Sequence, residues 1–156
     1  MHHTKAQMEI MRLLASNEET VSKLYRLFAK KFKAERQFWN ILSKEELIHA
    51  SWIKKLFPEV KKGELSFNQD RFKSEIIKNS IDYVTKEIKR FKKEDLSLKD
   101  ALSVAMDIEI TLTESKFFQI YEADSPKLKQ LLQALQDAFL GHRAKLEEML
   151  QKTSRA

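Results

Sequence analysis

The sequence has no cysteine, and its 156 residues include only two glycines and two prolines. Without cysteine the chain cannot form disulfides, thiolate-bound zinc sites, catalytic thiols or an iron centre held by four cysteines. A cysteine-free chain agrees with a reducing compartment, and we expect a cytoplasmic protein. Because glycine and proline form many turns, their scarcity predicts few turns and long helices, and therefore an all-α fold.

Long apolar runs are also missing from the sequence. No stretch approaches the ~18 apolar residues needed to cross a bilayer, and the opening Met1-His2-His3-Thr4 lacks the features of a signal peptide. Charged residues make up 33% of the chain and hydrophobic residues 42%, as in ordinary globular proteins. We therefore expect one domain over residues 1–156 with a single core, and no membrane partner.

The chain carries a formal net charge of +6. Its basic residues gather in two clusters: Lys30, Lys31, Lys33 and Lys86, Lys89, Arg90, Lys92, Lys93. Such clusters occur in nucleic-acid-binding proteins, but here Glu87 and Glu94 are interspersed and no row of aromatic residues accompanies the bases. Solvated helix faces explain the pattern better, so we expect only weak, salt-sensitive binding to nucleic acid.

Apolar residues recur at helical spacing over most of the chain. The predicted helices span residues 5–32, 35–57, 70–93, 98–122 and 126 to about 151. Ser16-Asn17 can also begin a helix, so a break near residue 16 is the alternative to one continuous first segment. The second helix should stop before Pro58, and residues 58–69 form the clearest loop.

Three of the predicted helix starts carry capping residues. Asn68 or Asp70 can cap the third helix, and Ser97 followed by Asp100 is a start signal for the fourth. Ser125-Pro126 places a cap and then proline at the first position of the last helix. Short connections pair the first helix with the second and the fourth with the fifth as antiparallel hairpins, while the third helix occupies the long crossover.

Glu46 and His49 stand three positions apart, so both project from the same face of the second helix. Leu42, Ile53 and Leu56 flank the pair, which places it in the middle of an apolar stripe. A core-facing carboxylate and imidazole are costly to bury unless they are paired or bind something between them. A single Glu-x-x-His is a weak motif, so its meaning depends on partners elsewhere in the chain.

The two hairpins resemble each other in the spacing of these positions. Leu42, Glu46, His49, Ile53 and Leu56 follow at steps of 4, 3, 4 and 3, and Leu135, Phe139, His142, Leu146 and Met149 repeat the same steps. Glu18 lies 31 residues before His49, and Glu109 lies 33 residues before His142. The repeat indicates a duplicated hairpin that folds into one four-helix bundle. Its centre would collect Glu18, Glu46, His49, Glu109 and His142.

These motifs resemble the rubrerythrin-like branch of the ferritin-like superfamily over nearly the whole chain. The similar stretches are Phe38-Trp39-x-x-Leu42-x-x-x-Glu46-x-x-His49-Ala50, Ala101-Leu102-x-x-Ala105-x-x-x-Glu109, and Ser125-Pro126 leading to Leu135 and His142. The resemblance implies a ferritin-like antiparallel four-helix bundle with an extra helix in the long crossover. It also implies a di-iron-type site whose metal ligands fall on Glu18, Glu46, His49, Glu109 and His142. Iron is the implied metal, with manganese or zinc as alternatives.

The sequence departs from this family at one ligand position, where Phe139 stands in place of the second Glu-x-x-His glutamate. The change removes one negative charge and adds an apolar wall beside the second ion. One interpretation is a rubrerythrin-like oxidoreductase that consumes peroxide or oxidises ferrous iron through a partly degenerate site. The alternative is a ferritin-like bundle without metal or catalysis, in which the five residues form a buried hydrogen-bonded network and the domain serves binding or structure. A basic nucleic-acid adaptor is supported by charge alone. By analogy with the family we also expect a homodimer.

Overall fold

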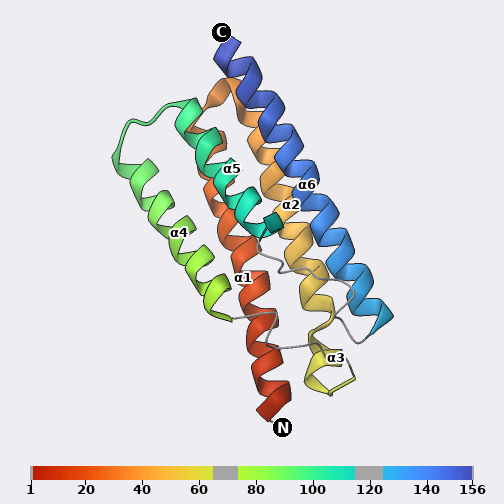
Figure 1. The fold of residues 1–156 in the computed structure, drawn as a ribbon. Coiled ribbons are helices and arrows are strands. Elements are labelled where there is room, and N and C mark those ends of the chain that lie inside the picture. The colour runs from red at the N-terminus through yellow and green to blue at the C-terminus, as the bar shows by residue number, and fades with distance from the viewer. Residues whose placement is uncertain (1, 65–73, 115–124, 156) are drawn as a thin grey trace.

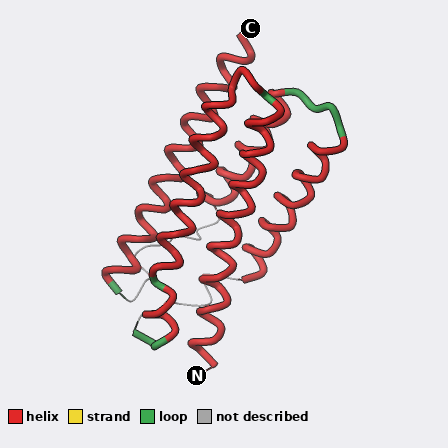
Figure 2. The backbone as a smooth tube through the Cα atoms, turned by 180° about the vertical axis from the view of Figure 1, so that it is seen from behind, coloured by secondary structure: helices red, strands yellow, loops and turns green. Residues whose placement is uncertain are grey.

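The computed structural model describes residues 2–64, 74–114 and 125–155, and every regular element within these ranges is helical (Figures 1 and 2). The elements are α1 (His2–Lys31), the short 3-10 helix η1 (Lys33–Glu35), α2 (Arg36–Lys55), α3 (Phe57–Lys61), α4 (Ser74–Lys93), α5 (Leu98–Glu114) and α6 (Pro126–Arg155). The predicted all-α class is confirmed for the part of the chain that the structure covers.

The long helices form two antiparallel pairs, as the short connections predict. Helix α1 packs along α2, α5 packs along α6, and contacts between α2 and α6 join the pairs (Figure 1). Helix α4 runs in the same direction as α1 and packs mainly against it (Figures 1 and 2). The crossover helix therefore covers the outside of the first pair and leaves the space between the pairs to side chains of α1, α2, α5 and α6.

Helix α1 begins at His2 and continues through Ser16-Asn17, so the single first helix is confirmed and the alternative of a break near residue 16 is wrong. Asn17 is 2% exposed, and its side-chain Oδ1 accepts a hydrogen bond of 2.8 Å from Ser80 Oγ on α4. Its polar group is thus used in packing between helices rather than in capping a new one.

The chain just after α2 also differs from the prediction. Helix α2 ends at Lys55, but residues 57–61 form the short helix α3, where a continuous loop from Pro58 was expected. Proline is tolerated in the first turn of a helix because its missing N–H would have no helical partner there. Buried Val60 of α3 lies in the core, and Gly63 ends this turn with a positive φ of 78°. The capping prediction for Asn68 and Asp70 and the end of the fourth predicted helix, residues 115–122, lie outside the described residues.

The two later capping predictions are confirmed. The backbone N–H of Ser97 donates to Asp100 Oδ2 at 2.9 Å, and the backbone N–H of Asp100 donates to Ser97 Oγ at 3.1 Å. Ser125 Oγ accepts a hydrogen bond of 3.0 Å from the backbone N–H of Leu128, with Pro126 as the first residue of α6. These bonds satisfy amides that have no helical partner.

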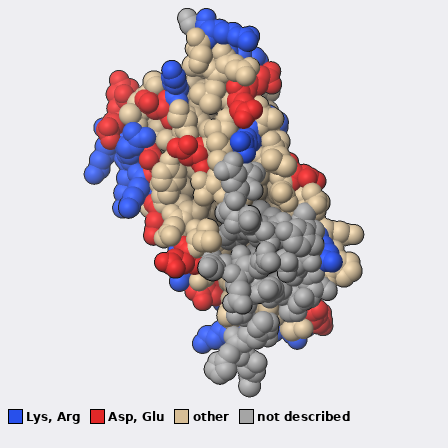
Figure 3. Space-filling model, viewed as in Figure 1, with Lys and Arg blue, Asp and Glu red and all other residues tan. Residues whose placement is uncertain are grey.

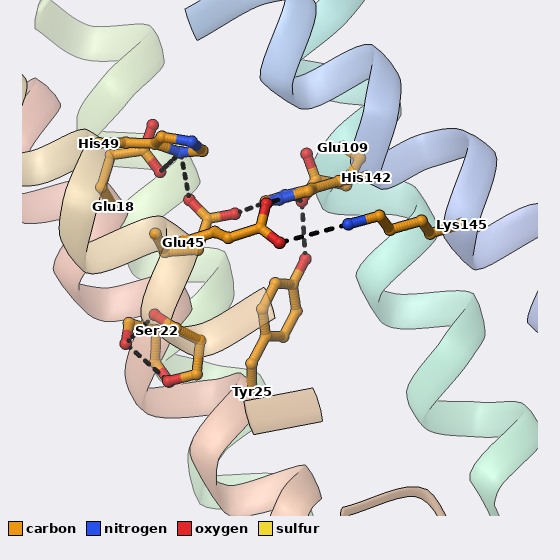
Figure 4. A network of polar contacts seen from close by, with 10 residues as sticks. Glu18, Ser22, Tyr25, Glu45, His49, Glu109, His142 and Lys145 are labelled. Atoms are coloured by element: carbon orange, nitrogen blue, oxygen red, sulfur yellow. Dashed lines mark hydrogen bonds and ion pairs between the residues drawn. The ribbon is translucent and has the colours of Figure 1, made fainter. Parts of the chain in front are cut away.

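Aromatic side chains fix α1, α2 and α4 to one another at one end of the core. The Phe28 ring lies 4.8 Å from Trp39 and 4.7 Å from Phe91, measured between centroids, and both pairs meet edge to face. Tyr25 stands 5.5 Å from Trp39 by the same measure. Tyr25 is the boundary of this aromatic cluster, because its hydroxyl faces the polar centre of the molecule rather than the apolar side (Figure 4).

Candidate metal centre

The five residues singled out by sequence come together between the two helix pairs (Figure 4). Each of the five side chains is buried, with at most 3% of the residue exposed. They are Glu18 on α1, Glu46 and His49 on α2, Glu109 on α5 and His142 on α6. Four helices therefore each supply at least one titratable group to one buried cluster.

The cluster consists of two overlapping groups that share Glu46. One group is Glu18, Glu46 and His49, and the other is Glu46, Glu109 and His142; within each, one ligand atom per residue lies within 4.8 Å of the others. The imidazole rings of His49 and His142 are 5.6 Å apart between centroids. Glu46 thus belongs to both groups and approaches both histidines.

In the group around His49, the side chains are close but do not satisfy one another. His49 Nδ1 lies 3.5 Å from Glu46 Oε2 and 4.0 Å from Glu18 Oε2. These three atoms are buried, and none has a hydrogen-bond partner in the described part of the chain. Buried polar atoms without partners are costly, so this group is incomplete as a purely protein structure.

In the group around His142 both ring nitrogens of the histidine meet carboxylates of the protein, although Glu46 Oε1 lacks a hydrogen-bond partner among the described residues. His142 Nδ1 lies 3.0 Å from Glu46 Oε1 and forms a hydrogen bond of 3.3 Å with Glu109 Oε1. The other ring nitrogen, Nε2, forms a hydrogen bond of 3.0 Å with Glu45 Oε2. Both nitrogens of this imidazole therefore face carboxylates.

Two residues of this network were not predicted from the sequence. Tyr25 donates its hydroxyl hydrogen to Glu109 Oε1 at 2.9 Å. Glu45 accepts a hydrogen bond from Lys145 Nζ at 3.2 Å, and its side chain is 33% exposed. In the sequence Tyr25 matches the apolar pattern of α1, and Glu45 lies on the flank of α2. Only the packing of α2 against α6 brings Glu45 to His142.

Burial and neighbouring charges shift the pKa values on the His142 side. Burial raises the pKa of Glu109 to about 7, assisted by the Glu46 carboxylate and opposed by His142. Burial alone would lower the pKa of His142, but the Glu109 and Glu46 carboxylates outweigh it and raise that pKa to about 11. The metal-free protein therefore holds His142 as a cation that donates from both ring nitrogens.

The two remaining carboxyls are shifted in opposite directions. Burial, and then the charge of Glu46, raise the pKa of Glu18 well above its usual value. Burial opposes ionisation of Glu46 as well, but contacts with Glu18, His142 and His49 lower its pKa below the usual value. Without metal, Glu18 is the carboxyl that keeps its proton and Glu46 is the ionised partner of His142.

Phe139 closes one side of the cluster. Its side chain is buried, at 1% exposed, and its ring meets the His49 ring edge to face with 6.1 Å between centroids. This is the position at which the sequence resemblance implies a glutamate. The expected apolar wall is present, but the ring packs against His49, whereas the sequence led us to expect it beside the second ion.

The donor set fits a metal ion at the incomplete group. Carboxylate oxygens and a neutral imidazole suit iron, manganese or zinc. In the described part of the chain neither Glu18 nor Glu46 forms an ion pair with lysine or arginine, so no side-chain cation except histidine balances them. A divalent cation at Glu18, Glu46 and His49 would replace the proton that Glu18 holds and occupy the unpartnered oxygen and nitrogen atoms.

Comparisons with protein-family models, curated proteins and solved structures found no match for this chain. Among the described helices, none combines the length and apolar character that a membrane crossing requires. The function must therefore be inferred from the buried cluster itself.

Proposed function

We propose that this chain is a rubrerythrin-like metal-binding protein built as a ferritin-like four-helix bundle. In this assignment α1, α2, α5 and α6 form the bundle and α4 is the helix of the long crossover. The metal is iron, with manganese or zinc as alternatives, and the activity is oxidation of ferrous iron or consumption of peroxide. Family resemblance in the motifs around Glu46, Glu109 and His142 supports the class of protein.

One observation carries the metal assignment. Glu18, Glu46 and His49 are buried together with polar atoms that lack hydrogen-bond partners among the described residues. A protein core rarely keeps such atoms, because each costs roughly 1–3 kcal/mol when left unsatisfied. A bound cation would remove this cost at all three residues, whereas the contacts that these side chains make with one another leave it in place.

The residues of the cluster form two positions for metal ions. Glu18, Glu46 and His49 hold the first ion, and Glu46 extends to a second position served by Glu109 and His142. Bound iron supplies the ferrous–ferric couple needed to reduce peroxide or dioxygen. The surrounding helices exclude water, and Phe139 provides an apolar wall. The second position has fewer charges because position 139 carries no glutamate, so its occupancy is lower.

Glu45, Lys145 and Tyr25 position the His142 side. Glu45 accepts from Nε2 of His142 and is itself held by Lys145, which leaves Nδ1 as the nitrogen facing Glu46 and Glu109. Carboxylates in this outer position orient ligating imidazoles and increase their basicity. Tyr25 fixes one oxygen of Glu109 by a hydrogen bond.

The alternative function is a bundle that has lost chemistry and serves binding or structure. The completeness of the His142 contacts favours it, because a histidine with both nitrogens paired to carboxylates needs no ion. Phe139 favours it too. Melting with ferrous or manganous ions separates the two: the metal assignment predicts a higher midpoint, abolished by Glu46→Ala but kept by Glu19→Ala, an acid on α1 outside the cluster. If the ions leave the midpoint unmoved and Glu46→Ala raises it, the structural function is correct.

We also propose a homodimer, by analogy with the family. Ile41 and Ile48 lie seven residues apart on α2, and each is more than 40% exposed. Residues at this spacing share one helix face, which offers an apolar strip to a second copy. Light scattering at micromolar concentration tests the dimer, and a monomer mass would contradict it.

A further inference from the structure

A second concentration of charge lies away from the buried cluster, in an open groove of about 210 Å³ between α1 and α4. Figure 3 shows lysine and arginine side chains gathered over the C-terminal half of α4, on one flank of the molecule. The groove itself is lined by Lys23, Arg26, Leu27, Lys30, Ile88 and Lys92. Its rim is therefore cationic and its floor is apolar.

The four cations of this groove have no acidic partners in the part of the chain that the structure describes. Other basic residues on the same helices do: Lys78 pairs with Glu9 at 3.3 Å, and Arg90 pairs with Glu87 at 2.7 Å. Among the described residues no carboxylate lies within ion-pair distance of Lys23, Arg26, Lys30 or Lys92. Four like charges around one hollow repel one another unless an anion sits between them.

Helix termini explain only part of this cluster. Lysines in the last turn of a helix interact favourably with the negative end of the helix dipole, and Lys30 and Lys92 are so placed. Lys23 and Arg26 lie further from the end of α1 at Lys31, beyond the last turn, where the dipole effect has faded. The helix dipole therefore does not account for these two cations, both of which are exposed.

The spacing of the cations selects the shape of the anion. At ~1.5 Å rise per residue, the backbone positions of Lys23 and Lys30 are roughly 10 Å apart along α1, so the cations are spread over a length that a chain of phosphates matches better than one tetrahedral ion. A linear chain of phosphates extends over this length. Arginine holds phosphate oxygens through two parallel N–H groups, and lysine contributes point charges.

We propose that this groove binds the phosphate chain of a small oligophosphate, either inorganic or carried by a nucleotide. Lys23, Arg26 and Lys30 hold the chain from α1, and Lys92 closes it from α4. The apolar floor at Leu27 and Ile88 gives a nucleoside a surface to cover. This site is separate from the buried cluster and does not depend on the metal proposal.

The test is calorimetric titration of the metal-free full chain with inorganic triphosphate, adenosine triphosphate and orthophosphate at low and moderate salt. Triphosphate should bind at least tenfold more tightly than orthophosphate. The variant Lys23→Gln/Lys30→Gln should lose at least tenfold in affinity. The control Lys44→Gln/Lys129→Gln removes two exposed lysines from α2 and α6 and should change affinity less than twofold. Circular dichroism checks that all variants fold.

The comparison of ligands identifies the source of the phosphates. Equal affinity for the two triphosphates assigns binding to the phosphate chain alone, and tighter binding of the nucleotide adds a contact to the groove floor. The proposal is overturned if both double variants lose affinity equally, or if the wild-type chain binds no triphosphate at millimolar concentration. It is also overturned if a short oligonucleotide binds far more tightly than triphosphate in the groove, because the partner is then a nucleic acid.

Discussion

The resemblance to the rubrerythrin-like branch implies the same role, that of metal ligand, for both histidines of the buried cluster, but their surroundings differ. His142 makes hydrogen bonds from both ring nitrogens, to Glu109 at 3.3 Å and Glu45 at 3.0 Å. His49 Nδ1 lies 3.5 Å from Glu46 and 4.0 Å from Glu18, and it has no hydrogen-bond partner among the described residues. The protein therefore supplies partners for both ring nitrogens of His142 and leaves Nδ1 of His49 without one among the described residues.

This difference indicates where an ion binds first. An ion at His142 must displace the proton that two carboxylates hold on Nδ1, with the pKa of that histidine raised to about 11. At His49 Nδ1 an ion replaces no hydrogen bond and satisfies atoms that are otherwise unpaired. The intact Glu-x-x-His of α2 is thus the stronger site, in agreement with the loss of its counterpart at Phe139.

The sharpest contrast comes from substituting each histidine alone. His49→Gln should abolish binding of the first ion and with it the metal-dependent rise in melting midpoint. A ligand at a hundredfold its Kd contributes about 2.7 kcal/mol, or roughly 5–11 °C for a domain of this size. His142→Gln should keep most of this rise. Differential scanning calorimetry with manganous ion, which resists air oxidation, measures both; equal losses in the two variants would contradict the ranking of the sites.

Placing a glutamate at position 139 tests whether its absence limits binding of the second ion. Phe139→Glu should raise the metal stoichiometry toward two and strengthen any peroxidase or ferroxidase rate. Without metal it should destabilise the fold by several kcal/mol, because it buries a carboxyl without a partner. Phe139→Gln is the neutral control of the same length. If Phe139→Glu destabilises the fold equally with and without metal, the added carboxylate does not bind metal and the proposed site is contradicted.

Stability should depend on pH in opposite ways with and without metal. Raised pKa values mean that the folded state binds protons more tightly, so their contribution is present at low pH and lost as pH rises. For Glu109 the loss falls between 4.5 and about 7, and for His142 between 6.5 and about 11. Metal-free protein should therefore become less stable from about pH 5 to about pH 8. Over the same range the increase in melting midpoint on adding metal should grow, because ions displace these protons. The lowered pKa of Glu46 affects stability only in more acidic solution, where this carboxyl takes up a proton.

Melting curves across this range, with chelator and with manganous ion, measure both trends. Glu109→Gln should flatten the metal-free curve between about pH 5 and about pH 7, since the amide that replaces the carboxyl does not titrate. A metal-free midpoint that rises steadily with pH would show that the buried carboxyls do not control stability.

The smallest expected effect concerns Glu45, which touches His142 from outside the predicted ligand set. Glu45→Gln should lower the affinity of the second ion 10- to 100-fold, roughly 1.4–2.7 kcal/mol, and leave the first ion unchanged. Glu148→Gln on α6 is an exposed control. Titration of metal into the Phe139→Glu background, where the second position is strengthened, gives the clearest readout. A loss at the first ion instead would place Glu45 in a different role.

The helices and the burial of the five residues were predictable because both depend on spacing along single helices. Apolar residues at helical intervals define which face is buried, and Glu46 and His49 lie within that face. Tyr25 and Glu45 were missed because their roles depend on contacts between helices. Tyr25 follows the apolar pattern of α1, and only its hydrogen bond to Glu109 on α5 distinguishes it.

The local errors have similar causes. Ser16-Asn17 offered an alternative helix start, but the side-chain oxygen of Asn17 accepts a hydrogen bond from Ser80 of α4, a residue 63 positions away. Residues 58–61 were expected to be loop because Pro58 disfavours continuation of the preceding helix, yet the same proline suits the first turn of α3. In each case the residue type suits two structural roles, and the local sequence does not show which role the packing of the helices selects.

The central claim is that Glu18, Glu46 and His49 hold a metal ion, and metal analysis tests it most directly. The full chain should be purified without chelator or metal-affinity resin, in wild-type form and as a His2→Ala/His3→Ala variant that cannot collect ions at its N-terminus. Inductively coupled plasma mass spectrometry should find at least one iron, manganese or zinc ion per chain in both, and none in Glu46→Ala. A metal content near zero in both, unchanged after reconstitution with ferrous or manganous ions, would contradict the claim.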